Sequence, residues 1–597
     1  MKILLVAINA KYIHSNPAVY SLKSCVGEHE SCVDIIEFTI NQQSSFILRE
    51  IYKRHPDVIA FSCYIWNITL IDNIIPDLYK VLPDTDIWAG GPEVSYDAAE
   101  VIQKWKIRGV MTGPGEYIFR RLVSSYVQNS SDNLPVILDG NCENRIPLDE
   151  IPFWYKDLTD FEHRIIYYES SRGCPFSCIY CLSSINRTMD FRSVERVCRD
   201  LDFFLEKKVS QVKFVDRTFN CNKDHALPIL KHILEHDNGI TNFHFEIAAD
   251  LLDEDYFELL EKFRPGAVQL EIGVQSTYEK TIDEINRKMN FDKVADAVRR
   301  IIDRDNIHVH LDLIAGLPYE DLYTFRISFN DVYVLCPEQL QLGFLKVLKG
   351  SDMEKNADRY GLTYTSLPPY EVLSTEWLSY EDVCHLKRIE EVLEIYYNSG
   401  QFHNSLEYLS TYFETPFDMY DYIAEWYEDH ELFGIQYSRV QKYEILSECG
   451  IAHIITCITC TEEQKHVHGQ NDAQWKTFLA GRTSEIGLSS EYVISVFKEY
   501  LTVDLYLREH MKNRPALCPS LGHWKNKIHD ILHEESETHA LFPELSDYNY
   551  RELTKALHVE IFECIFDRPT AMIFSYEKRS PLTKNCSVQY IVLGKLD

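Results

Sequence analysis

Three cysteines in the middle of the chain have the spacing of a ligand set for iron. Cys174, Cys178 and Cys181 lie in the segment SRGCPFSCIYC, directly after an apolar stretch that favours a strand. Thiolates are soft ligands that select iron–sulfur clusters or zinc, and three of them on one loop suit a [4Fe–4S] cluster. One iron would keep an open position, which indicates a reactive cluster. A zinc site completed by a distant histidine and a chance spacing are the alternatives.

Short apolar stretches alternate with amphipathic ones over residues 1–130. Strands alternating with helices predict an α/β fold with a parallel, doubly wound sheet. Small residues follow several of these strands, and ligands of open α/β sheets bind at the carboxyl ends of strands. The expected strands are KILLVAIN (2–9), CVDIIEF (32–38), VIAFSCY (58–64), DIWAGGP (86–92) and GVMTG (109–113), with helices between them such as 44–54 and 69–81.

The rest of the chain divides into a linker, a second alternating series and a helical part. Residues 131–163 are polar and punctuated by proline, as expected of a linker. Residues 164–350 repeat strand and helix six times, enough for a barrel or partial barrel. Long aromatic-rich amphipathic segments such as 380–399 and 489–512 predict a mainly helical region over 351–597. The strands expected in the second series are 164–171, 211–218, 242–250, 267–276, 308–318 and 339–348.

Length and composition limit the class of protein. The 597 residues exceed one hydrophobic core and suggest about three or four domains. The formal net charge of −32 opposes binding to free nucleic acid and to anionic lipid. Neither a targeting segment nor an apolar stretch long enough to span a membrane is visible, so we expect a cytoplasmic protein. Its 17 cysteines are then expected to be reduced.

With the aromatic Tyr180 before its last cysteine, the cysteine motif resembles the signature of the radical S-adenosylmethionine (SAM) enzymes. Its position after the first strand of a six-fold series matches the partial (β/α)6 barrel of that superfamily. Three later segments resemble the superfamily as well. FVDRTFN (214–220) is similar to the segment near the SAM amino group, EIGVQS (271–276) to the one near the ribose, and DLIAGLPYED (312–321) to the one that supports adenine.

The resemblance implies a role for individual residues around SAM. The three cysteines would hold three irons of the cluster, and the fourth iron would bind the amino and carboxylate groups of SAM. Arg287 would pair with the SAM carboxylate, and for Glu246 a salt bridge at a strand end is the alternative. The implied contacts are Phe214, Val215 and Asp216 to the methionyl end, Glu246, Glu271 and Gln275 to the ribose, and Leu313 and Gly316 to adenine.

A doubly wound domain ahead of such a barrel resembles the B12-binding class of radical SAM proteins. GGPEVSYD (90–97) and GPGEYIF (113–119) are similar to its cobalamin-binding, Rossmann-like domain, and 386–402 resembles an uncharacterised helical domain attached to such proteins. No D-x-H-x-x-G pattern occurs in the first 130 residues, which implies base-off cobalamin without a histidine ligand. The residues implied near cobalamin are Ser62, Gly90, Gly91, Glu93, Gly113, Gly115 and Glu116, with Tyr12 and His14 as weaker candidates that suit a surface or core role equally.

The resemblance implies a cobalamin-dependent radical SAM enzyme. A 5′-deoxyadenosyl radical would abstract hydrogen from an unactivated carbon, and methylcobalamin would deliver a methyl group. Cyclisation and ring rearrangement occur on the same architecture, and nothing in the sequence separates these outcomes. We expect a small-molecule, lipid or peptide substrate and an external electron donor of the flavodoxin or ferredoxin type.

Two rival functions and one further motif stay open. A B12-binding regulatory module would have a structural cluster closed by a fourth ligand. A methylthiotransferase-like tRNA enzyme would need a second cluster, but Cys25, Cys32 and Cys63 lack suitable spacing. Cys457-x2-Cys460, followed by His466 and His468, has metal-like spacing without a second cysteine pair, and ordinary thiols are the simpler interpretation.

Overall fold

The computed structural model describes residues 1–142, 145–185, 187–464 and 489–594, without the side chains of 460–464. The chain forms two compact units. The first contains Met1–Phe325 and Leu342–Val383, and the second contains Arg326–Gln341 and Cys384–Asp597.

The first unit begins with a six-stranded parallel sheet in the order β2-β1-β3-β4-β5-β6. The order reverses between β1 and β3, which makes the carboxyl ends of these strands a topological switch point. The strands are β1 (Ile3–Asn9), β2 (Val33–Thr39), β3 (Val58–Ser62), β4 (Asp86–Gly90), β5 (Gly109–Thr112) and β6 (Ile137–Asp139). The helices are α1 (Pro17–Ser24), α2 (Ser44–Tyr52), α3 (Ile68–Val81), α4 (Pro92–Ser95), α5 (Ala98–Trp105) and α6 (Gly115–Val127).

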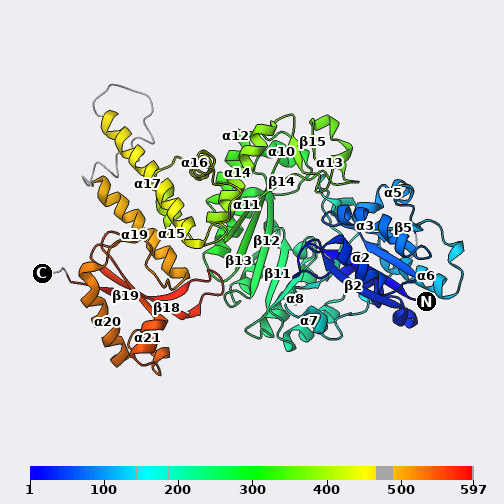
Figure 1. Ribbon diagram of the computed structural model, residues 1–597, viewed down its shortest axis with the longest axis horizontal. Coiled ribbons are helices and arrows are strands. Elements are labelled where there is room, and N and C mark those ends of the chain that lie inside the picture. The colour runs from blue at the N-terminus through cyan, green and yellow to red at the C-terminus, as the bar shows by residue number, and fades with distance from the viewer. Residues whose placement is uncertain (143–144, 186, 465–488, 595–597) are drawn as a thin grey trace. The chain divides into compact units, whose positions relative to one another are not determined.

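Both faces of this sheet are buried, as the continuous apolar strands predict. Leu4 and Val6 of β1 pack into one core with residues of α2, α3 and α5. The alternate residues Ile3 and Leu5 pack into a second core with α1 and α6. Helices therefore cover both faces of the sheet (Figure 1), and the expected doubly wound fold is confirmed.

The segment expected to be a linker contributes to this sheet. Within 131–163, β6 pairs in parallel with β5 through Val110 and Ile137, Met111 and Leu138, and Thr112 and Asp139. The sequence hides this strand because Ile137–Asp139 is only three residues long and lies among polar residues. The first sheet therefore extends past residue 130, and its carboxyl edge includes Asp139.

A second sheet of six strands follows in the order β14-β13-β12-β11-β10-β7. Strands β7 to β13 pair in parallel with their neighbours, and the helices lie between them in the chain, so the expected partial barrel is confirmed. Its strands are β7 (Ile166–Tyr168), β10 (Gln211–Phe214), β11 (Asn242–Ile247), β12 (Val268–Gln275), β13 (His308–Ala315) and β14 (Gln339–Phe344). Its helices are α7 (Val194–Glu206), α8 (Lys223–Glu235), α9 (Glu254–Leu260), α10 (Glu279–Glu284), α11 (Phe291–Ile302) and α12 (Leu322–Tyr333).

The segment Leu342–Val383 belongs to the first unit, whereas the sequence places a boundary at 350. Met353, Tyr360 and Val372 are buried in one cluster with Ile282 and Leu317 of the barrel. Apolar contact with the barrel thus extends the first unit by about thirty residues over a region expected to begin a helical domain. It contains α13 (Asp352–Lys355) and the hairpin of β15 (Thr363–Tyr364) and β16 (Val372–Ser374).

The second unit is mainly helical, as predicted, but it ends in a sheet that the sequence analysis missed. The antiparallel strands are β17 (Leu557–Phe562), β18 (Thr570–Arg579) and β19 (Cys586–Val592), beside α20 and α21 in Figure 1. Its helices are α14 (Tyr380–Tyr396), α15 (His403–Ser410), α16 (Pro416–Asp429), α17 (Arg439–Gln464), α19 (Ser490–Arg508), α20 (Lys525–Thr538) and α21 (Tyr550–Ala556). Every helix of the described residues is too short or too polar to cross a lipid bilayer.

Candidate functional site

The three cysteines of the motif lie on one loop between two short paired strands. β8 (Ser171–Arg172) precedes the loop, β9 (Asp190–Phe191) follows it, and the two pair antiparallel. Cys178 is buried, and Cys174 and Cys181 are partly exposed; all three are free thiols. Burial raises the pKa of Cys174, and the two other thiols raise it further, so the three sulfur atoms lie within electrostatic reach of one another.

Contacts from two barrel segments hold the cysteine loop. The Cys178 side of the loop is fixed by a backbone hydrogen bond of 3.0 Å from Ile179 N to Ile285 O. Nη1 of Arg287 lies 3.9 Å from Cys178 Sγ and donates a hydrogen bond of 3.3 Å to Tyr180 Oη. Cys174 Sγ lies 4.0 Å from Thr218 Oγ1, on the segment after β10. The loop is therefore held against the carboxyl ends of the barrel strands.

A cavity of about 150 Å³ lies beside this loop at the ends of β10, β11 and β12. The predicted residues Cys178, Glu246, Glu271, Gln275 and Arg287 all line it. Its wall therefore combines a thiol with cationic and acidic side chains. The sequence analysis did not single out the other polar residues of the wall, which are Arg217, Thr218, Asp250, Lys288 and Asp312.

Two buried polar atoms at this cavity, Oε1 of Gln275 and Nε of Arg287, have neither a hydrogen-bond partner nor an ion-pair partner. A third buried atom, Oδ1 of Asp312, has an ion-pair partner in His310 Nε2 at 3.0 Å. Gln275 has a left-handed backbone with φ of 74°, and the pairing of β12 with β13 shifts register between Gly273 and Gln275. A Cβ at Gly273 would lie 2.2 Å from Gln275 Nε2, so a larger residue there would displace the end of the Gln275 side chain. Buried polar atoms without partners are costly, and they suit a ligand with hydroxyl, amino or carboxylate groups.

Ionisable side chains from neighbouring strands form a charged row inside the barrel. Glu246, Glu271 and His310 are register partners on β11, β12 and β13. Glu271 Oε2 lies 2.9 Å from His244 Nε2 and 3.1 Å from Lys213 Nζ. The hydrogen bond with His244 and the charge of Lys213 together outweigh the effect of burial and lower the pKa of Glu271 to about 2. For Glu246 burial outweighs the nearby Arg217 and raises the pKa to about 7, so two carboxyls of one cavity differ in protonation.

A larger cavity of about 700 Å³ lies at the carboxyl edge of the first sheet. The residues predicted near cobalamin that line it are Ser62, Gly90, Gly91, Gly113, Gly115 and Glu116. Val215, which the sequence analysis predicted near the methionyl end of SAM, lines this cavity as well. Residues of the barrel and the cysteine loop complete the wall, namely Tyr167, Glu169, Arg172, Leu182, Ile185 and Val215. The cavity thus lies between the first sheet and the barrel, within the first unit.

Close backbone approach shapes this larger cavity. Gly91 has φ of 118°, and a Cβ there would lie 2.3 Å from Cys63 O. Gly113 has φ of 69°, and a Cβ there would lie 2.6 Å from Asn141 Nδ2. The backbone conformation and packing at these two positions therefore require glycine, and both lie at the edge where ligands of such sheets bind.

Several residues singled out in the sequence line neither cavity. Glu93 is buried and accepts a hydrogen bond of 2.9 Å from Tyr370 Oη. Gly316 faces the side chain of Val372, and Leu313 is buried in the barrel. Tyr12 is exposed, and His14 Nδ1 lies 2.6 Å from Tyr167 Oη. Their predicted contacts with cofactors stay predictions.

Asp216 and Phe214 have partners in the interior of the barrel, and their predicted contacts with SAM stay predictions. Asp216 is fully buried and accepts hydrogen bonds from Ser170 N, Ser170 Oγ and Ser171 Oγ at 2.5–2.8 Å. Burial raises its pKa to about 6 despite these donors. Phe214 packs against Phe219 and Phe245. Asp216 therefore positions the strand that leads into the cysteine loop, a role the sequence did not reveal.

Sequence signals existed for some of the residues that the analysis missed. His244, His310 and Asp312 alternate with apolar residues in their strands, which is the pattern of ionisable side chains on one face of a sheet. Arg172 stands two residues before Cys174, where a cation beside a cluster loop could have been noticed. Asp139 and Asn141 were missed because their segment was interpreted as a linker.

The donor set at each place fits the cofactors that the sequence implies. Three free thiols on one loop fit an iron–sulfur cluster. The smaller cavity, with its orphaned Gln275 and Arg287 atoms, fits a zwitterionic ligand with hydroxyl groups. The glycine-lined cavity of about 700 Å³ at the edge of the first sheet fits a large ligand.

Three family models match consecutive parts of the chain. Residues 3–123 match the B12 binding domain, and 168–329 match the radical SAM superfamily. The chain thus contains a B12-binding domain followed by a radical SAM domain. Residues 358–578 match a protein of unknown function, DUF4080, so the helical C-terminal region of this radical SAM protein belongs to a family without an assigned role.

Curated proteins of similar sequence are named as methyltransferases. The cobalamin-dependent radical SAM methyltransferase TokK of Streptomyces tokunonensis is 24% identical over 51% of this chain and 50% of its own length. The 2-(S-pantetheinyl)-carbapenam-3-carboxylate methyltransferase of Streptantibioticus cattleyicolor is 24% identical over 45% of this chain and 44% of its own. The chain thus spans about half the length of these curated relatives.

A solved structure shares the fold at low identity. It is the cobalamin-dependent S-adenosylmethionine radical enzyme OxsB with aqua-cobalamin bound. The TM-score is 0.54 at 12% identity, over 84% of this chain and 80% of that one. The expected fold class of this radical SAM protein is therefore confirmed.

The second cysteine motif is only partly described. Cys457 Sγ lies 3.4 Å from His453 Nε2 on the same helix, α17. The side chain of Cys460 and residues His466 and His468 lie outside the described residues. The interpretation of this motif as ordinary thiols stays a prediction.

Proposed function

We propose that this protein is a cobalamin-dependent radical SAM methyltransferase that adds a methyl group to an unactivated carbon of a small molecule. The matched B12-binding and radical SAM families support the pair of cofactors. The names of its relatives support methyl transfer, and one of them acts on a carbapenam carboxylate. We assign the first unit to catalysis and 384–597 to a separate domain without an assigned role.

One observation carries this proposal: a single short segment borders both cavities. After β10, Val215 lines the larger cavity, and Arg217 and Thr218 line the smaller one. The residues of this segment that line the two cavities are at most three positions apart in the sequence. A ligand in the smaller cavity would therefore lie close to a ligand in the larger one. Two cofactors that act on the same substrate carbon require such proximity.

The chain's own residues would divide the binding task between the two cavities. Cys174, Cys178 and Cys181 would hold the cluster, and Arg287 with Gln275 would orient SAM through their unpartnered polar atoms. Glu271, ionised at neutral pH, would accept hydrogen bonds from ribose hydroxyls. When bound, the cluster with SAM supplies a hydrogen-abstracting carbon radical, and methylcobalamin supplies the methyl group.

Cobalamin in the larger cavity would be base-off and without a protein histidine on cobalt. In support, the described residues lining this cavity include tyrosine, leucine and isoleucine but no histidine. The test is electron paramagnetic resonance of the cob(II)alamin-loaded protein. A cobalt signal without nitrogen superhyperfine splitting is expected, and clear splitting from a nitrogen ligand would refute this part of the proposal.

The rival function, a binding module with a closed structural cluster, makes a specific prediction here. A fourth thiol does lie close by, because Cys174 and Asp216 both raise the pKa of Cys221, to about 11, on top of the effect of burial. Cys221→Ala therefore separates the two functions. An enzyme with an open iron position would keep its iron and its SAM cleavage in this variant, and a closed cluster would lose iron.

The activity test uses anaerobically purified, cluster-loaded protein with SAM, methylcobalamin and a low-potential reductant. We expect 5′-deoxyadenosine and methionine in the wild type and in Cys221→Ala. Neither product is expected in the single alanine variants of Cys174, Cys178 and Cys181. Failure to form 5′-deoxyadenosine with an intact cluster, across a panel of small-molecule substrates, would overturn the proposal. A methylated product would exclude a reaction that only rearranges or cyclises the substrate. Replacing the chemical reductant by flavodoxin or ferredoxin tests the expected electron donor.

A further inference from the structure

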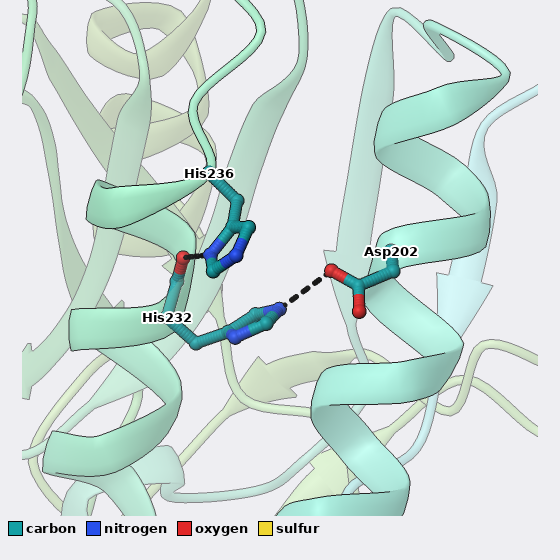
Figure 2. A group of neighbouring side chains, drawn as sticks. All are labelled: Asp202, His232 and His236. Carbon is teal, nitrogen blue, oxygen red and sulfur yellow. Dashed lines mark hydrogen bonds and ion pairs between the residues drawn. The ribbon is translucent and has the colours of Figure 1, made fainter.

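Two helices on the outside of the barrel bring two histidines and an aspartate together. His232 lies near the end of α8, His236 is the residue that caps this helix, and Asp202 lies on the neighbouring helix α7. Nε2 of His232 lies 2.7 Å from Asp202 Oδ1 (Figure 2). One ligand atom from each residue lies within 4.8 Å of both others. None of the three residues belongs to either cavity of the proposed enzyme.

We propose that Asp202, His232 and His236 bind a divalent transition-metal cation that links α7 to α8. Two imidazoles and one carboxylate are a common ligand set of zinc, with water in the fourth position. Nitrogen donors select zinc, nickel or cobalt over calcium and magnesium, which prefer oxygen.

The spacing of the histidines follows from helix geometry. Residues four apart lie on one face of a helix, one turn from each other. The two imidazole rings are stacked with centroids 4.1 Å apart and an angle of 25°. A carboxylate from a second helix completes the group, so a bound cation would connect α7 to α8.

The hydrogen bond of His236 leaves a ligand atom available. His236 Nδ1 lies 2.9 Å from the backbone oxygen of His232, as Figure 2 shows. A carbonyl oxygen only accepts, so Nδ1 carries the proton and Nε2 of the neutral ring keeps a lone pair. Metal-binding histidines usually make such a second hydrogen bond, which fixes the ring and its tautomer.

The remaining distances leave room for a cation after small side-chain movements. Tetrahedral bonds of about 2.0–2.1 Å separate ligand atoms by roughly 3.3 Å. The contact of 2.7 Å between His232 and Asp202 would open by about 0.6 Å, and the cation would take the place of the proton in it. Asp202 is 44% exposed and His236 is exposed, so a cation reaches the group from solvent without any change of the backbone.

Zinc is the probe, and the test uses cluster-loaded protein in metal-free buffer. We expect one additional zinc per chain by mass spectrometry of the metals, with iron content unchanged. Zinc X-ray absorption should show nitrogen and oxygen ligands near 2.0–2.1 Å, whereas zinc bound by thiols would show sulfur near 2.3 Å. Affinity should fall at least tenfold in His236→Ala and His232→Ala, and several-fold in Asp202→Asn.

The control is the other histidine pair with the same spacing, His529 and His533 on α20. Their ring centroids lie 6.1 Å apart, and they are not part of a three-ligand group of this kind. His533→Ala should bind zinc like the wild type. His236 is exposed, so His236→Ala is expected to fold even where His232→Ala does not. Zinc with sulfur ligands, no bound zinc, or equal zinc affinity in His236→Ala and His533→Ala would each overturn the proposal.

Discussion

Arg172 Nη2 lies 2.8 Å from Glu116 Oε1. This ion pair joins the start of α6, which packs on the first sheet, to β8, the strand that leads into the cysteine loop. Both residues line the larger cavity. Arg172 also contacts Glu169 at 2.7 Å, so one guanidinium holds two carboxylates. Burial would raise the pKa of Glu116, but Arg172 lowers it overall, which keeps the carboxylate charged.

Removing this guanidinium should destabilise the first unit. In Arg172→Met the Glu116 side chain, only 9% exposed, would be left without its cation, at a cost of roughly 3 kcal/mol. The free energy of unfolding in urea measures this cost, and retained cobalamin measures the effect on the larger cavity. We expect both to fall.

The matched control is the ion pair of Lys156 and Glu30, which has the same distance of 2.8 Å but exposed side chains. Lys156→Met should cost less than about 1 kcal/mol, because solvent screens such pairs. Equal losses in the two variants would contradict a special role for Arg172.

Two adjacent glycines at the end of β4 should respond differently to alanine. Gly91→Ala places a Cβ against Cys63 O in a left-handed conformation, so the strand end must move and cobalamin binding should be lost. Gly90→Ala meets its nearest atom, Met111 O, at 3.4 Å and should keep most of the binding. Cobalamin per chain after gel filtration is the measurement. Loss in both variants, or in neither, would contradict this account of the cavity edge.

Arg287 should affect SAM without affecting the cluster. Arg287→Lys removes the planar guanidinium, which donates hydrogen bonds to the Gly273 carbonyl and Tyr180 Oη. It also removes the buried Nε, which has no partner and is free to bind SAM. We expect SAM affinity to fall at least tenfold, measured by equilibrium dialysis, with iron per chain unchanged. Arg299→Lys, at an exposed position of α11, is the control. Loss of iron in Arg287→Lys would instead assign the residue to the loop's stability.

Much of the architecture of the first unit could be predicted from the sequence because its strands are buried on both faces. Continuous apolar stretches such as that of β1 predict strands of a parallel sheet. The cysteine spacing is specific enough to predict the cluster loop. β6 escaped prediction because three residues carry no periodic signal. The sheet of β17 to β19 escaped because aromatic residues are common in both strands and buried helices.

The walls of the two cavities were predicted less completely, for a physical reason. Local motifs indicate which loops approach a ligand, and they led to Gln275, Arg287 and the glycines. Residues such as Tyr64, Asn141 and Tyr167 reach the larger cavity only through the packing of separate elements, and no local pattern reports that. Asp216 has a further set of partners that its motif did not indicate, because its side chain accepts hydrogen bonds from Ser170 and Ser171.

The last prediction concerns the buried carboxyl of Glu246. Burial raises its pKa from 4.5 to about 7, so the folded protein holds this proton to higher pH than the unfolded chain does. The group therefore costs stability as the pH rises from about 4.5 to 7, and the full cost remains above 7. Glu246→Gln replaces the ionisable carboxyl with an uncharged amide of the same shape. Its stability relative to the wild type should increase by about 2 kcal/mol between pH 5.5 and 8.5.

Urea unfolding of SAM-free protein at several pH values measures this difference, with Glu258→Gln at an exposed position of α9 as the control. The control measures the effect of the same change, from carboxylate to amide, at an exposed position. Glu246→Gln should gain on the wild type mainly between pH 5.5 and 7, where the folded carboxyl loses its proton and the unfolded one has already lost it. A difference that stays constant, or that shrinks as the pH rises, would mean that Arg217 and Lys213 keep Glu246 ionised. Glu246 and Glu271 would then not differ in protonation near neutral pH.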